Sequence, residues 1–116
     1  METQTTENTT AKTADEILLE DILNELDITF DDEQTKKKIA DIAKRGKARL
    51  IQLAGHKLDF AENMQARELL FSYCRYGRSN AIEQFEHDFS RQLTAFELEE
   101  AVADLPESGA ESEETV

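Results

Sequence analysis

Five large apolar side chains recur at helical spacing near the C-terminal end of the chain, and this pattern constrains the fold more than any other feature. They are Ile82, Phe85, Phe89, Leu93 and Phe96, separated by steps of three, four, four and three residues. An α-helix turns once every ~3.6 residues, so these side chains share one helix face. The pattern predicts a helix over 80–97, capped by Ser79 or Asn80. Glutamates beyond 97 oppose the helix dipole, so we expect the helix to end there.

Three further helices are predicted at 14–26, 32–54 and 60–77. Thr13 and Glu16 form a capping-box pattern before the first, in which each side chain satisfies a free backbone N–H. The chain is therefore predicted to be all-α, a compact bundle of about four helices.

Single residues indicate where these helices begin and end. Asp31 is expected to cap the second helix, and Asp59 the third. Gly55 and Gly77 are placed to terminate the second and third helices. Gly46 lies on the apolar stripe of the second helix, where it predicts the close approach of another backbone.

The length of 116 residues fits one domain, which we place at 14–103. Residues 1–13 are rich in Thr, Gln, Glu and Asn, and residues 104–116 contain five acidic residues and no basic one. Both segments are predicted to be flexible tails, because they offer little apolar surface to bury.

Several function classes are disfavoured by composition. A single cysteine excludes an internal disulfide framework, and no Cys/His cluster with metal-ligand spacing is present. Uninterrupted apolar runs reach three residues, whereas a bilayer-spanning helix needs ~20. Residues 1–13 do not resemble a secretory signal. We therefore expect an intracellular protein with no membrane association, no metal and no cofactor.

Cys74 is the one candidate nucleophile, with His56 or His87 as its base. Its neighbours Leu70, Phe71 and Tyr73 favour instead a buried cysteine that acts as a small hydrophobic side chain. The sequence therefore predicts no catalytic residue and no enzyme activity.

A basic block lies within the second predicted helix. It comprises Lys36, Lys37, Lys38, Lys44, Arg45, Lys47 and Arg49, with Asp41 as the one acidic residue among them. Nine acidic residues in 15–33 can neutralise this block within a subunit or across a subunit boundary, which is the interpretation we favour. The alternative is nucleic-acid binding, which the net charge of −13 opposes.

Arg75 and Arg78 flank Gly77 at the end of the third predicted helix. They can bind the last exposed carbonyls of that helix, or cross to a carboxylate on a neighbouring subunit. Sequence leaves both possibilities open.

Five segments in one order resemble the small head-to-tail connector proteins of tailed bacteriophages, also called adaptor or head completion proteins. They are DILNELDITFDD at 21–32, RGKARLI at 45–51, LDF at 58–60, ARELLFSYCRY at 66–76 and SNAIEQFEHDF at 79–89. The resemblance covers about 17–96, nearly all of the predicted domain.

This resemblance implies a helical subunit of a twelvefold ring beneath the portal protein, at the head–tail interface of the virion, assembled in the host cytoplasm. The ring would extend the channel through which double-stranded DNA passes without specific binding. It would also present a platform to a stopper or tail-completion protein. The resemblance implies no catalysis.

The apolar pattern of the sequence and the resemblance to connector proteins together suggest candidate contact residues. Apolar residues late in the chain exceed what four helices need for a core, and the resemblance places portal binding after the last helix. The portal-docking candidates are Leu93, Phe96, Leu98 and Val102, and the inter-subunit candidates are Lys36, Lys37, Lys38, Arg45, Arg75 and Arg78. Two alternatives remain: a DNA-binding packaging module like a terminase small subunit, using the helix 36–49, and an acidic regulator that mimics DNA.

Overall fold

The computed structural model describes residues 12–28, 32–103 and 105, and in these residues it contains five α-helices and no strand. The helices are α2 (Ala14–Glu25), α3 (Glu33–Ala54), α4 (Met64–Arg78), α5 (Ile82–Asp88) and α6 (Ser90–Ala103). The predicted all-α class is confirmed. There are five helices instead of four because the last predicted helix is divided in two. The predicted tails at 1–13 and 104–116 lie outside the described residues, apart from positions 12, 13 and 105.

The starts of α2 and α3 are fixed by local side-chain bonds. Thr13 Oγ1 accepts from the Glu16 amide at 3.1 Å, and Glu16 Oε1 accepts from the Thr13 amide at 2.9 Å, which confirms the capping box. The α3 cap is Asp32, one residue after the predicted Asp31, and its carboxylate accepts from the Gln34 amide at 3.1 Å. A second bond from the Thr35 hydroxyl lowers the pKa of Asp32. Gly55 ends α3 with φ +81°, as predicted.

The third predicted helix begins four residues later than expected, at Met64. Asp59 makes a turn instead of a helix cap, because its carboxylate accepts from the Ala61 amide at 2.9 Å. Asn63 is the cap of α4, and its Oδ1 accepts from the Ala66 amide at 3.0 Å.

Gly77 does not terminate α4, which continues to Arg78. A Cβ at Gly77 would lie 2.6 Å from Ile42 Cγ2, so this glycine allows α3 and α4 to approach closely. Gly46 has the same role on α3, where a Cβ would lie 2.8 Å from Leu70 Cδ1. The expected close approach at Gly46 therefore exists, but side chains of α4 make it, not a backbone.

The fourth predicted helix is interrupted at Phe89, where φ is −104° and ψ is 17°. The amide of Phe89 bonds to the Phe85 carbonyl, and its carbonyl accepts from the Leu93 amide at 2.8 Å, so the two backbone bonds of Phe89 join α5 to α6 across the bend. Neither Ser79 nor Asn80 caps α5, because Asn80 adopts a left-handed φ of 56° and Ala81 precedes the helix. The second piece, α6, continues to Ala103, six residues beyond the predicted end.

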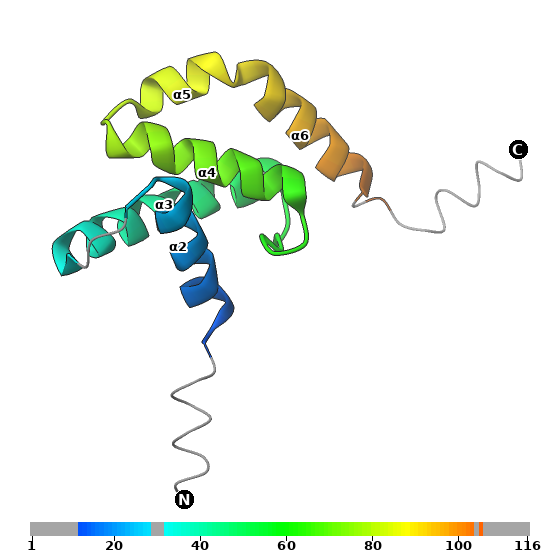
Figure 1. Ribbon diagram of the computed structural model, residues 1–116. Helices are drawn as coiled ribbons and strands as arrows, with labels where there is room; N and C mark the ends of the chain where they lie inside the picture. The colour runs from blue at the N-terminus through cyan, green and yellow to red at the C-terminus, as the bar shows by residue number, and fades with distance from the viewer. Residues whose placement is uncertain (1–11, 29–31, 104, 106–116) are drawn as a thin grey trace, which may run out of the picture.

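The helices are arranged around α4, which packs against α3 along most of its length (Figure 1). α5 returns beside α4, α2 lies on the other side of α4, and α6 crosses to α3. Twenty apolar residues are buried between them, and all buried side chains in the described part of the chain are apolar. No helix within the described ranges is long and apolar enough to cross a membrane.

Candidate docking and assembly surfaces

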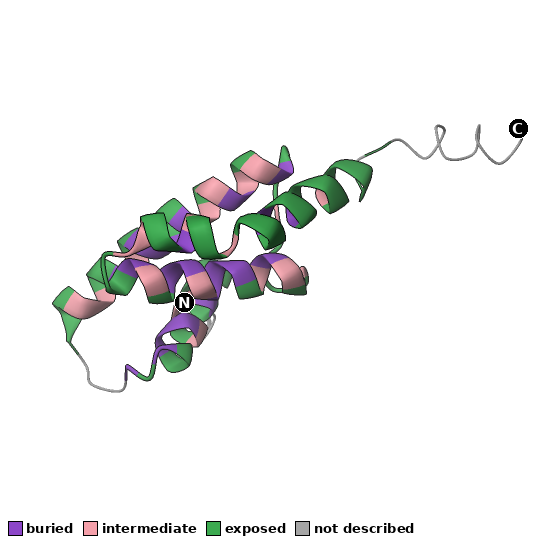
Figure 2. Ribbon diagram, turned by 90° about the horizontal axis from the view of Figure 1, so that it is seen from above, coloured by how far each residue is buried: buried purple, intermediate pink, exposed green. Residues whose placement is uncertain are grey.

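The outward face of α6 is apolar and exposed. Leu98 and Val102 are 62% and 66% exposed, and their spacing of four residues places them on one side of the helix. Leu105, which follows the end of α6, is 62% exposed. Leu93 and Phe96 point the other way, into the core, where they are 5% and 0% exposed. α6 therefore has two apolar stripes, and the subunit covers the inner one. Figure 2 shows how much of α6 is exposed.

The structure divides the four portal-docking candidates into two pairs. Leu93 and Phe96 are part of the subunit's own core. The expectation that the core does not need them is therefore wrong for these two residues. Leu98 and Val102 remain available to a partner.

Glu100 anchors the C-terminal half of α6 to the loop that joins α3 to α4. Its Oε1 lies 3.1 Å from His56 Nε2, and its Oε2 accepts from Asn63 Nδ2 at 2.9 Å. His56 Nδ1 is 2.8 Å from the Lys57 carbonyl oxygen. These contacts fix α6 from its inner side and leave the outer stripe uncovered. They also explain why the expected helix end at 97 is wrong, since Glu100 gains partners that offset its unfavourable position near the helix end.

Among the described residues, acidic side chains neutralise only part of the basic block on α3. Lys47 Nζ lies 2.8 Å from Asp15 Oδ1 on α2. Arg49 binds Glu86 on α5 through two hydrogen bonds of 2.9 and 3.0 Å, which raise the pKa of Arg49. The remaining exposed cations have no ion pair with any residue in the described part of the chain; they are Lys37, Lys38, Lys44 and Arg45. Lys36 is half-buried.

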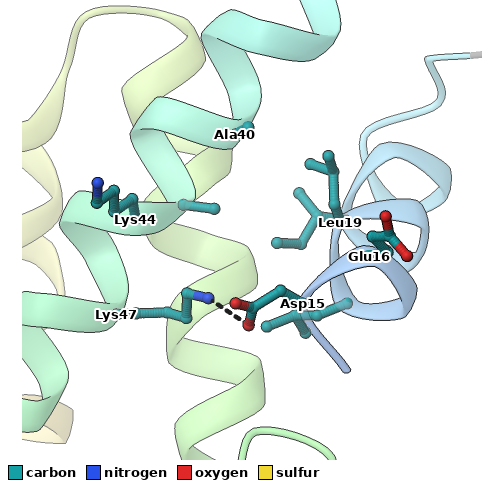
Figure 3. A pocket seen from close by; sticks show the side chains of 9 residues that line it. Asp15, Glu16, Leu19, Ala40, Lys44 and Lys47 are labelled. Carbon is teal, nitrogen blue, oxygen red and sulfur yellow. Dashed lines mark hydrogen bonds and ion pairs between the residues drawn. The ribbon is translucent and has the colours of Figure 1, made fainter. Parts of the chain in front are cut away.

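A groove of about 500 Å³ lies between α2 and α3 (Figure 3). Its apolar side chains are Leu18, Leu19, Ile22, Ala40 and Ala43. Asp15 and Lys47 meet across one end of the groove, and Lys44 stands at its edge on α3. The groove therefore combines an apolar floor with charges of both signs, Asp15 and Glu16 on α2 and Lys44 and Lys47 on α3.

The arginines of α4 bind α2 of the same chain. Arg78 Nη1 donates to the Leu26 carbonyl at 3.0 Å, and Arg75 Nη2 lies 3.8 Å from Glu25 Oε2. Both therefore point to the C-terminal end of α2, where positive charge is favourable, and not to the end of their own helix. Arg67, which sequence reasoning missed, lies on the same face and binds Asp21 Oδ2 at 2.5 Å.

Cys74 is fully buried, and burial raises its pKa to about 12, so the thiol stays protonated at neutral pH. His87 lies on the surface near Asp88. Across the described ranges, no group of three or more His, Cys, Asp or Glu side chains is placed to hold a metal ion.

Comparison with protein-family models, with curated proteins and with solved structures finds no match to this chain.

Proposed function

We propose that this chain is a structural assembly subunit, a helical member of a twelvefold connector ring beneath a bacteriophage portal. The ring would extend the DNA channel and present a platform to a stopper or tail-completion protein. In this proposal the subunit docks onto the portal through the outer stripe of α6, formed by Leu98 and Val102. The exposure of that stripe is the observation that carries the proposal.

A helix with apolar side chains on two opposite faces is typical of a helix with neighbours on both sides. The inner face of α6 has its neighbours in the core, whereas no described residue of the subunit covers the outer face. Leu98 and Val102 are four residues apart, a spacing with which helix side chains enter an apolar groove on a partner. Exposed apolar surface of this kind marks protein–protein contact sites.

The net charge of −13 is compatible with a channel through which DNA slides. Carboxylates repel phosphates, so a wall rich in acidic residues holds DNA weakly. The alternative of a DNA-binding packaging module would use Lys37, Lys38, Lys44 and Arg45. A duplex band shift that is strong at low salt and fades as salt rises would favour that alternative.

The decisive experiment measures binding to purified rings of the portal protein of the same phage. The double variant Leu98→Asp/Val102→Asp should lose binding and keep the circular-dichroism spectrum of the wild type, because both side chains are exposed in the subunit. Met64→Asp is the matched control, since Met64 is 61% exposed but lies at the start of α4. Portal binding by the double variant at wild-type strength would overturn the docking assignment.

A further inference from the structure

Four cations on α3 form one exposed patch, which we name the α3 basic face: Lys37, Lys38, Lys44 and Arg45. Positions 37 and 44, and positions 38 and 45, are seven residues apart, so the four side chains make two parallel rows along the outward side of the helix. Asp41 is the one acidic residue between them, which leaves a net charge of +3. A patch of this sign is unusual on a protein with a net charge of −13.

The charge complement of this patch lies at the C-terminal end of the chain. Residues 104–116 contain five carboxylates and no basic residue. The second residue of the segment is apolar, Leu105, and it is 62% exposed. The sequence Leu105-Pro106-Glu107 thus places an apolar side chain two residues before a carboxylate.

The groove between α2 and α3 offers sites for both kinds of group. Leu19 and Ala40 provide an apolar floor, and Lys44 of the α3 basic face stands at its edge (Figure 3). If an apolar side chain of the acidic segment lay in the groove, it would bring a neighbouring carboxylate of the same segment close to Lys44. A proline in such a segment favours the extended backbone that fits a groove.

These two surfaces lie at opposite ends of the subunit. The first turns of α3, which carry Lys37 and Lys38 of the basic face, are at one end, and α6 terminates at the other end (Figures 1 and 2). Contact between different surfaces of two identical subunits is head-to-tail, and head-to-tail contacts close into rings when the rotation between neighbours allows it.

We propose that the acidic segment 104–116 of one copy binds the α3 basic face of a second copy, with Leu105 in the groove between α2 and α3. The contact itself does not depend on the proposed function; only its closure into a ring rests on that function. The contact is ionic at an exposed surface, so it weakens with salt and is favoured when copies are concentrated.

Zero-length crosslinking of carboxylates to lysines tests this proposal on the full chain, without a portal. Equal amounts of ¹⁴N-labelled and ¹⁵N-labelled protein are mixed at high concentration and low salt, and crosslinked peptides are identified by mass spectrometry. We expect residues 104–116 to crosslink to Lys37, Lys38 and Lys44, with mixed-isotope pairs in the proportion given by random pairing of chains. Lys57, an exposed lysine in the loop after α3, is the internal control and should crosslink little.

A charge reversal that leaves every lysine in place separates specific from random crosslinking. Arg45→Glu should reduce the crosslinks to the three lysines several-fold, whereas Arg91→Glu, the same charge change on α6, should not. Crosslinks found only within one chain, or equal yields at Lys57, would overturn the proposal. The proposal would also be overturned if duplex DNA bound to the α3 basic face and residues 104–116 did not. Because no portal is present, the result is independent of whether α6 docks onto one.

Discussion

Replacing Phe85 by alanine tests whether the aromatic cluster at the centre of the subunit holds the fold together. Phe85 is 0% exposed. Its ring centroid lies 5.4 Å from that of Tyr73 and 5.8 Å from that of Tyr76, both edge-to-face, and 4.9 Å from that of Phe89 in a stacked arrangement. One side chain thus joins α4, α5 and the bend before α6.

The expected cost follows from this burial. Truncation of a buried phenylalanine to alanine destabilises a protein by about 3–5 kcal/mol, through lost apolar transfer energy and the cavity that remains. Domains are held by about 5–15 kcal/mol in total, so Phe85→Ala removes a large share of the free energy of unfolding. For a domain of this size, each kcal/mol lowers the melting temperature by about 4–8 °C, which gives a decrease of roughly 12–40 °C.

Phe89→Ala provides the matched comparison. Phe89 is half-buried at the bend, so its truncation should cost about half as much as truncation of Phe85. Thermal melts followed by far-ultraviolet circular dichroism, together with urea titrations, measure both variants. A decrease of only a few degrees for Phe85→Ala, or a larger loss for Phe89→Ala than for Phe85→Ala, would refute this account of the core.

Three further predictions concern packing, the chain end and a helix cap. Gly77→Ala should cost about 1–3 kcal/mol in a urea titration, because its new Cβ would lie 2.6 Å from the stiff side chain of Ile42; an unchanged midpoint would contradict this. Ending the chain after Asp104 should leave the melting temperature nearly unchanged, whereas an end after position 94 removes the fully buried Phe96 and should unfold the subunit; a stable shorter chain would show that α6 is dispensable for folding. The pKa of Asp32 is lowered in the folded state, so its contribution to stability is present above the unfolded pKa and is lost as pH falls through the lower folded pKa. The Asp32→Ala variant should therefore lose less stability than the wild type on acidification below about pH 4. Acid titrations that run parallel for the two proteins would argue against this role of Asp32.

Features decided by neighbours in sequence were predictable. The Thr13–Glu16 capping box and the left-handed end of α3 at Gly55 depend on residues within a few positions, and both are as predicted. The cap of α4 was not predictable in the same way, because Asp59 and Asn63 both satisfy the local preference for a helix start. The bond from Asp59 to the Ala61 amide uses its carboxylate in a turn and leaves the cap to Asn63.

Features decided by distant contacts were not predictable from spacing. Gly77 is typical of a helix end, yet it is retained inside α4 because Ile42 of α3 occupies the space that a Cβ would need. Arg78 binds a carbonyl that lies 52 positions away in the chain, which no local pattern indicates. The docking candidates show the same limit, because Leu93 and Leu98 were grouped as apolar residues late in the chain, whereas they lie on opposite sides of α6, one in the core and the other exposed.

The attachment of α2 gives the subunit two levels of local stability. α2 contributes three buried side chains, and it is held further by Arg67, Arg75 and Lys47 through ion pairs at or near the surface. Ion pairs of this kind are screened by salt, whereas the apolar contact between α3 and α4 is not. Rising ionic strength should therefore lower the free energy of local opening of α2 more than that of the α3–α4 centre, and amide hydrogen exchange would measure this difference.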